Sequence, residues 1–102
     1  MAEHLILNFE TFAAQINTTF LVKPAADLTV ELRLIESNDK SVPGQEMFSL
    51  IFRGPEQTFL PQHIYQIEHD RIGSFDLFIV PVGRDEGGYR YEAIFNRVRK
   101  QS

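Results

Sequence analysis

The segment FDLFIVPVGRDEGGYRYEAIF, residues 75–95, is the most informative about the fold, because it holds two alternating stretches on either side of a turn sequence. The apolar residues that recur at every second position are Phe75, Leu77, Ile79, Tyr91, Ala93 and Phe95. An alternation of period two is typical of a strand with one buried face. Between the two stretches, Gly87 and Gly88 can supply the positive φ angles of a tight turn. The segment therefore predicts an antiparallel hairpin.

Four segments upstream of this hairpin also have the character of strands. Their ranges are 19–23, 28–34, 46–52 and 63–69. The alternation is clearest in residues 28–34, where leucine or valine at every second position is separated by Thr29, Glu31 and Arg33. Residues 37–41 are polar and predict a loop. About six short antiparallel strands with hairpin-sized connections are typical of a small barrel or sandwich, and we expect one mainly β domain over residues 1–102.

A short helix is predicted near the start of the chain, at residues 9–16. Phe9, Phe12, Ala13 and Ile16 have the spacing of one helical face, and Asn8 is a suitable N-cap. Three large apolar side chains on one face need a surface to bury them. We therefore expect the helix to pack on the sheet.

Strand parity divides the remaining apolar residues between two faces of the sheet. The face that continues the buried set of the hairpin, and that we predict as core, holds Phe48, Leu50, Phe52, Tyr65 and Ile67. The opposite face is not uniformly polar, since it holds Met47, Ile51, Phe78, Val80 and Ile94. A monomer rarely leaves such a patch bare. Either the helix or another subunit should cover it, and we expect the helix.

The composition is that of an ordinary globular domain, with 43% hydrophobic residues, 24% charged residues and no cysteine. A chain without cysteine has no disulfide and no thiolate ligand. The net charge of −4 repels a phosphate backbone, so nucleic acid is not expected as a partner. The apolar runs are too short to span a bilayer and no signal peptide is predicted, so we expect a cytoplasmic protein without membrane contact.

His63 and His69 are the most obvious candidates for a metal site. On one strand their separation is roughly 20 Å, too long for one ion whose ligands lie about 2 Å away. His69 shares the parity of Tyr65 and Ile67, so we expect a hydrogen-bonded histidine in the core or at its rim. We predict no metal, no cofactor and no catalytic residue.

Five polar residues are candidates for a binding or structural role, namely Arg53, His69, Glu92, Asn96 and Arg97. A carboxylate on a sheet is stabilised by a cation on the neighbouring strand, so we expect Glu92 to pair with Arg53 or Arg33. We also expect Asn96 to fix the end of its strand through a hydrogen bond from side chain to backbone.

Four motifs in this order carry a resemblance to a known family: FSLIFRGP (48–55), LPQHIYQIEH (60–69), FIVPVGRD (78–85) and YEAIFNR (91–97). They resemble a family of small bacterial domains of unknown function. The segment FETFAAQINTTFLV (9–22) resembles the opening segment of that family, with Asn17 where a glycine is expected. Asparagine tolerates the left-handed conformation, so the turn need not change. The resemblance implies genes encoded beside phage-tail-like proteins, and it implies no catalytic residue.

Two classes of function follow from these observations. The leading hypothesis is a non-enzymatic structural or protein-interaction domain, an accessory of a phage-tail-like or surface assembly, which meets a protein partner or a second copy through the apolar sheet face. The alternative is a small-ligand-binding protein or enzyme with a pocket near Arg53, His69, Glu92 and Asn96. A pocket of a few hundred cubic ångströms is about the most that a barrel of this size can hold.

Overall fold

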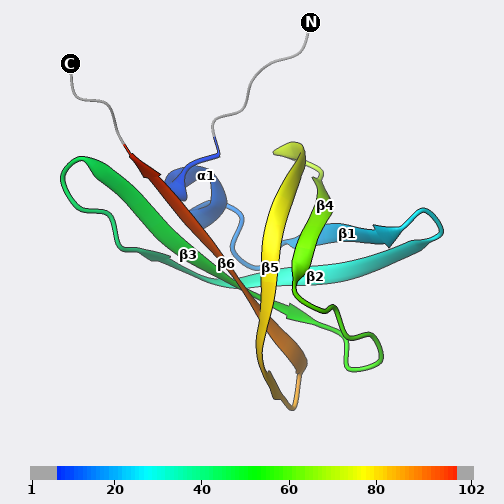
Figure 1. Cartoon of the computed structure of the whole chain (residues 1–102). Helices are drawn as coiled ribbons and strands as arrows, with labels where there is room; N and C mark the ends of the chain where they lie inside the picture. The colour runs from blue at the N-terminus through cyan, green and yellow to red at the C-terminus, as the bar shows by residue number, and fades with distance from the viewer. Residues whose placement is uncertain (1–6, 99–102) are drawn as a thin grey trace, which may run out of the picture.

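A computed structural model of the chain describes residues 7–98, the last two by their backbone alone. It contains α1 (Phe9–Ala13), β1 (Thr19–Ala25), β2 (Leu28–Asp39), β3 (Gln45–Gly54), β4 (His63–His69), β5 (Gly73–Asp85) and β6 (Gly88–Val98) (Figure 1). The strands form one closed barrel in the order β1-β2-β3-β6-β5-β4, and every neighbouring pair is antiparallel. The predicted mainly β fold with six strands and one short helix is confirmed, and of the two predicted architectures the chain adopts the barrel.

Hairpins make four of the six pairings, and two pairings join strands that are distant in the sequence. The longer of these joins β3 to β6, from Gln45 opposite Val98 to Gly54 opposite Tyr89. The shorter closes the barrel between β1 and β4 and extends only from Leu21 to Lys23. The salt bridge from Lys23 to Glu68, at 3.6 Å, spans this seam.

Both prolines inside strands lie where the pairing register shifts. Pro24 lies in the shift of β1 against β2, and Pro81 begins the shift of β5 against β6. Proline has no N–H to donate to a neighbouring strand, so a bulge is where a sheet accommodates it. The bulges also increase the local twist that a closed barrel requires.

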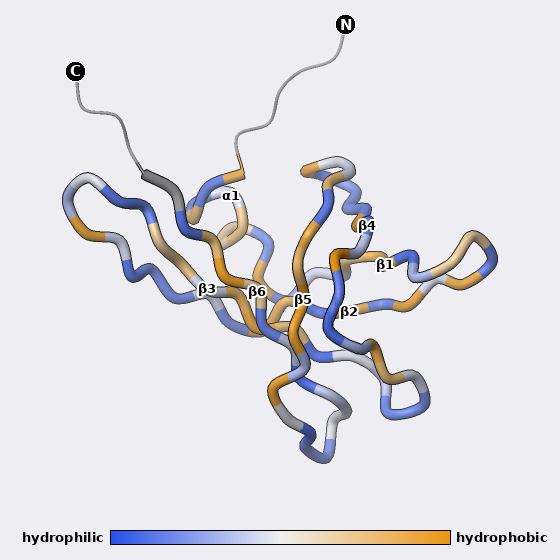
Figure 2. The backbone as a smooth tube through the Cα atoms, viewed as in Figure 1, coloured by the Kyte–Doolittle hydropathy of each residue, from blue (hydrophilic) through white to orange (hydrophobic). Residues whose placement is uncertain are grey.

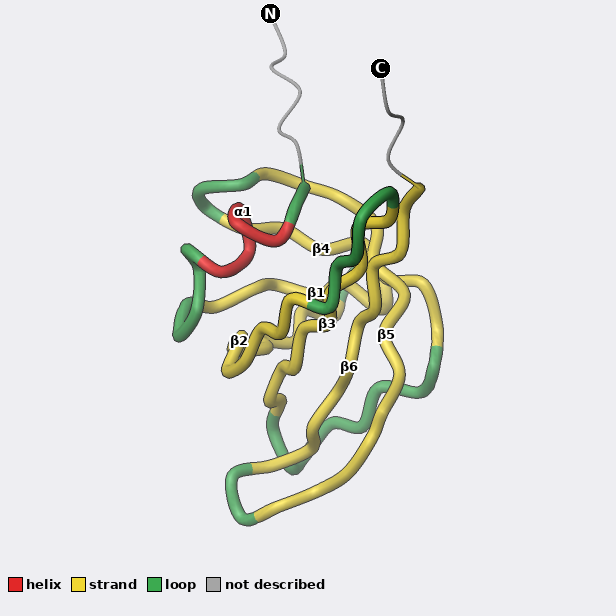
Figure 3. Tube along the Cα trace, turned by 90° about the vertical axis from the view of Figure 1, so that its left-hand side faces the viewer, coloured by secondary structure: helices red, strands yellow, loops and turns green. Residues whose placement is uncertain are grey.

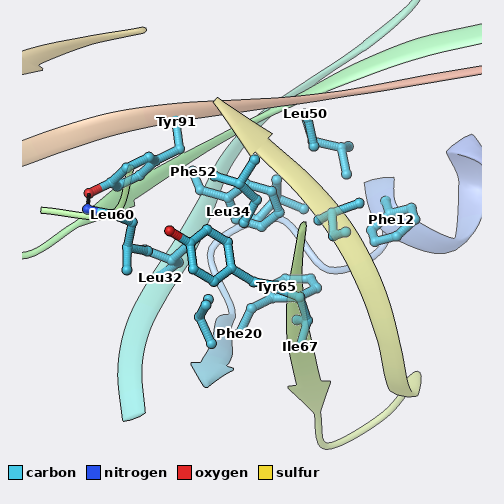
Figure 4. Close-up of a cluster of buried hydrophobic side chains, with 14 of the residues drawn as sticks. Phe12, Phe20, Leu32, Leu34, Leu50, Phe52, Leu60, Tyr65, Ile67 and Tyr91 are labelled. Carbon is cyan, nitrogen blue, oxygen red and sulfur yellow. Dashed lines mark hydrogen bonds between the residues drawn. The ribbon is translucent and has the colours of Figure 1, made fainter. Parts of the chain in front are cut away.

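The core fills the inside of the barrel, and every predicted core residue belongs to it. All are buried except Phe75 and Phe95, which are partly buried against the same cluster. Figure 4 shows side chains from several strands meeting in this core. The buried hydroxyl of Tyr91 accepts a hydrogen bond from the backbone N–H of Leu60, at 3.0 Å. Because both polar groups are satisfied, the tyrosine can be completely buried.

The hydropathy of the residues along the chain agrees with this division between a buried core and exposed turns (Figure 2). The tip of the β5–β6 hairpin is hydrophilic, whereas the middle of β6 is hydrophobic. In β2 the alternation is confirmed from Val30 to Leu34, which are buried at every second position. Leu28, the first residue of the strand, is exposed.

The helix is shorter than predicted, and it packs against a different part of the barrel from the one predicted. It ends at Ala13, with Asn8 as the predicted N-cap, whose side chain accepts from the N–H of Thr11. Asn17, which follows the helix, has a φ of 71° and takes the left-handed conformation expected at this position. Its N–H donates to the carbonyl of Leu34 on β2, at 2.7 Å.

Phe12 shows where the helix packs. Its ring contacts four other phenylalanines, which are Phe20, Phe48, Phe75 and Phe95. These residues lie at the same end of the barrel, near the starts of β1, β3 and β5 and the end of β6. The helix therefore closes one end of the barrel (Figure 3), and the prediction that it covers the outer face of the sheet is wrong.

Two connections differ from their predictions. The polar residues 37–39 belong to β2, which continues to Asp39 opposite Phe48, so the predicted loop is shorter. In the β5–β6 hairpin the strands extend to Asp85 and Gly88, and only Gly88 of the two adjacent glycines has a positive φ, of 128°. The predicted hairpin is confirmed with a tighter turn.

Candidate functional site

The polar candidates from the sequence do not share one pocket. Arg53 lines a hollow of about 670 Å³, His69 a second of about 310 Å³, and Glu92 a third of about 240 Å³. Asn96 accepts a hydrogen bond from the side chain of Gln45, so its partner is a side chain and the predicted bond to the backbone is not formed. The side chain of Arg97 lies outside the described part of the structure. These residues therefore do not build the single site of the alternative hypothesis.

His69 is a buried structural histidine, as its parity predicted. Its ring packs on Phe20, with 4.3 Å between centroids. Its Nδ1 accepts from the backbone N–H of Arg71, at 3.0 Å. The hydroxyl of Thr18 donates to the carbonyl of Gln15, so it accepts the hydrogen of His69 Nε2, at 2.8 Å. This network holds the neutral ring and ties the turn after α1 to the end of β4.

Burial lowers the pKa of His69 from its ordinary value of 6.5, with Arg71 acting in the same direction and Asp70 in the opposite one. Protonation at Nδ1 would also cost the hydrogen bond from Arg71. The imidazole is therefore neutral at pH 7 in the folded protein.

This lowered pKa makes stability depend on pH. The unfolded chain takes up a proton before the folded chain does, so the contribution of His69 is complete above pH 6.5 and is lost as the pH falls from 6.5 towards the folded pKa. We expect urea denaturation to give a smaller free energy of unfolding at pH 5 than at pH 8. His69→Gln should remove this difference. His63→Gln, at an exposed position of the same strand, should keep it. The same pH dependence in both variants would mean that His69 is not the group responsible.

Arg53 has a different ionic partner from the predicted one. Its guanidinium donates to the carboxylate of Asp85 at 2.9 Å, and the other oxygen of Asp85 accepts from the N–H of Gly87 at 2.8 Å. These two hydrogen bonds lower the pKa of Asp85, the bond from Arg53 having the larger effect. The prediction that Glu92 pairs with Arg53 or Arg33 is therefore wrong.

A row of apolar side chains lies on the outside of the barrel, across β4, β5 and β6. Ile64 is opposite Phe78 in the register, and Phe78 and Ile94 line the same hollow together with Val80. The residues Ile64, Phe78 and Ile94 are 59%, 48% and 63% exposed. We call Ile64, Phe78, Val80 and Ile94 the outer patch. Such exposure of neighbouring large apolar residues is a property of binding surfaces.

The outer patch is smaller than the apolar face that the sequence predicts, because Ile51 is buried and Met47 is half-buried. Carboxylates border the patch. Glu92 lies opposite Val80 and lines the same hollow, and the exposed Asp76 precedes Phe78 by two residues on β5. Neither carboxylate forms a salt bridge with another described residue. The site is therefore an apolar surface with an acidic border.

The described residues, 7–98, contain no cluster of metal ligands and no helix that could cross a membrane. Within this range no three histidine, aspartate or glutamate side chains are placed so that they could hold a metal ion. No helix of the described chain has the length and apolar character to cross a membrane.

A comparison of the sequence with models of protein families found a matching family. A family model with the description "Domain of unknown function (DUF6916)" matches residues 7–95. The chain belongs to this family. The DUF6916 match begins before α1 and ends within β6, so it covers nearly the whole barrel, and it confirms the resemblance to a family of unknown function. Searches of curated proteins and of solved structures found no match.

Proposed function

We propose that this domain is a non-enzymatic protein-interaction domain, and that its partner binds to the outer patch. The observation that carries the proposal is the exposure of Ile64, Phe78 and Ile94 on three neighbouring strands. Each is large enough to anchor an interface when a pocket of a partner covers it. Rigid strands hold the three anchors in a fixed arrangement, which lowers the entropy lost on binding.

The closed barrel determines how a partner can bind. Each strand pairs with two neighbours, so no strand of the described barrel is an edge strand along its whole length. Binding at the outer patch relies on side chains that project from a face. The outer patch has these side chains, and the hollow of about 240 Å³ between Phe78, Val80, Glu92 and Ile94 can receive an apolar group of the partner.

The acidic border defines the chemistry of the partner. A two-fold dimer through the outer patch would bring together Asp76 and Glu92 from both copies, and no basic side chain lines the hollow between Phe78 and Ile94. Like charges that meet in an interface cost several kcal/mol. The occupant that we propose is therefore a different protein, with an apolar surface bordered by lysine or arginine. Within this proposal the domain is an accessory of a phage-tail-like or surface assembly, the association that the sequence resemblance implies.

Site-specific photo-crosslinking tests the proposal. A photo-reactive phenylalanine analogue replaces Phe78 in the cells that naturally produce the protein, and a matched copy carries it in place of Asp27, in the exposed turn between β1 and β2. We expect one discrete adduct with a different protein from position 78 and none from position 27.

The purified partner then provides the control. It should retain binding to Asp27→Ala and lose it with Phe78→Asp. Adducts of the same pattern from both positions, an adduct with a second copy of the chain, or no adduct at position 78 would contradict the proposal.

A further inference from the structure

Three arginines form a row on the outside of the barrel, across β2, β3 and β6. Arg33 on β2 lies opposite Arg53 on β3, and Arg53 lies opposite Arg90 on β6. Like charges directly opposite each other on neighbouring strands are destabilising. Asp85 compensates Arg53 at 2.9 Å, and Glu36 lies 3.9 Å from Arg90. Arg33 is exposed and forms no salt bridge within the described residues.

Two of the arginines line the largest of the three hollows, of about 670 Å³. The side chains with polar groups along its wall are Thr19, Thr29, Glu31, Arg33, Arg53 and Thr58. The hollow is a concavity open to solvent, with room for a small ligand. Hydroxyls and guanidinium groups that surround one concavity are the donors that bind a multiply charged oxyanion. We call this concavity the arginine hollow.

The tip of the β5–β6 hairpin fixes the position of Arg53. Asp85 holds one guanidinium nitrogen, and Gly87 lies so close that a Cβ on it would be 2.9 Å from Cδ and Nε of Arg53. Nε itself is buried and has no hydrogen-bond partner in the described structure. The glycine therefore leaves room for the guanidinium against the turn, and the side chain is ordered before any ligand arrives. An ordered donor loses little entropy on binding.

We propose that the arginine hollow binds a hydroxyl-bearing phosphate monoester, such as a sugar phosphate. Arg33 and Arg53 bind the phosphate, whose negative charge compensates the unpaired Arg33. The threonines and Glu31 meet the hydroxyl groups of the ligand, and the carboxylate accepts hydrogen bonds from these hydroxyl groups. This site is independent of the partner surface, because the arginine hollow is lined from β1, β2, β3, the β3–β4 connection and the β5–β6 turn, and the outer patch lies on β4, β5 and β6.

An NMR titration of the folded protein with glucose 6-phosphate tests the proposal, with glucose and inorganic phosphate as comparison probes. Glucose 6-phosphate should shift the side-chain Nε–H signals of Arg33 and Arg53 and the amide signal of Thr58. Arg33→Gln should weaken the affinity about tenfold or more. This variant should fold normally, because Arg33 is exposed and its removal relieves the repulsion from Arg53. Arg71→Gln, at an exposed arginine outside the arginine hollow, should bind as tightly as the wild type.

A second variant, Gly87→Ala, keeps the charges of Arg33 and Arg53 and changes only the position of Arg53. Gly87→Ala should displace the guanidinium of Arg53 and weaken binding several-fold, and Gly83→Ala, whose Cβ meets no atom within 4 Å, should not. The proposal fails if these signals stay unmoved at tens of millimolar glucose 6-phosphate, or if Arg33→Gln and Arg71→Gln lose the same affinity. Equal affinities for glucose 6-phosphate and inorganic phosphate would overturn the assignment of the hydroxyl groups.

Discussion

Phe12→Ala should lower the free energy of unfolding by about 3–5 kcal/mol, the range for removing a buried phenylalanine. The side chain is completely buried, and its ring contacts four other phenylalanines at the end of the barrel. A helix of five residues is too short to be stable by itself, so it depends on this contact. Losing the ring leaves a cavity between the helix and the strand ends.

Urea denaturation monitored by far-UV circular dichroism measures this loss. The matched control is Phe78→Ala, at a half-exposed phenylalanine of the outer patch, which should change the free energy of unfolding by less than about 1 kcal/mol. Equal effects of the two substitutions would mean that α1 does not close the barrel.

Gly88→Ala should be the other strongly destabilising change, with a loss of about 2–5 kcal/mol from backbone strain and overpacking together. Gly88 has a φ of 128°, a conformation that residues with a side chain rarely adopt. A Cβ at this position would overlap the carbonyl oxygen of Gly54 on β3. Because the Cβ is fixed to the backbone of β6 and the oxygen belongs to the backbone of β3, neither can move without breaking the pairing of β3 with β6.

Thermal denaturation of Gly88→Ala and Gly83→Ala provides the comparison. Gly83 has free space around it and no positive φ, so Gly83→Ala should be neutral or stabilise by less than about 1 kcal/mol. A Gly88→Ala variant that melts at the wild-type temperature would show that the hairpin tip does not have the described geometry.

The inside of the barrel could be predicted because strand parity depends only on the local sequence. Alternation placed residues such as Leu50, Ile67 and Tyr91 in the core without any knowledge of which strands are neighbours. The turn at Asn17 could be predicted for a similar reason, since the left-handed conformation restricts the residue types at one position. Both inferences rest on interactions within a few residues of chain.

The position of the helix and the length of β2 depend on contacts that are distant in the sequence. Phe12 fits the end of the barrel because four strand ends converge there, and one-dimensional spacing contains no record of that convergence. Residues 37–39 have the composition of a loop, yet pairing with β3 satisfies their backbone groups. Tertiary pairing therefore overrides local preference in this strand.

The row of three arginines and the pairing of Arg53 with Asp85 could not be predicted from the sequence, and the reason is the same for both. Parity assigns a side chain to a face of the sheet, but only the register determines its neighbours. The register places Glu92 opposite Ile51 and puts Arg53 between Arg33 and Arg90. The signal that could have revealed the row is the arginine at an outward position in each of the three strands, once β3 is known to lie between β2 and β6.

The decisive measurement for the outer patch is the affinity of the crosslinked partner for Phe78→Asp, determined by calorimetry with both proteins purified. We expect this substitution to weaken binding at least about tenfold, because it places a charge at the centre of an apolar interface, while the circular dichroism spectrum and melting temperature stay those of the wild type. Glu92→Gln should weaken binding less and reduce its dependence on salt. An unchanged affinity of Phe78→Asp would mean that the partner binds elsewhere on the barrel and not at the outer patch.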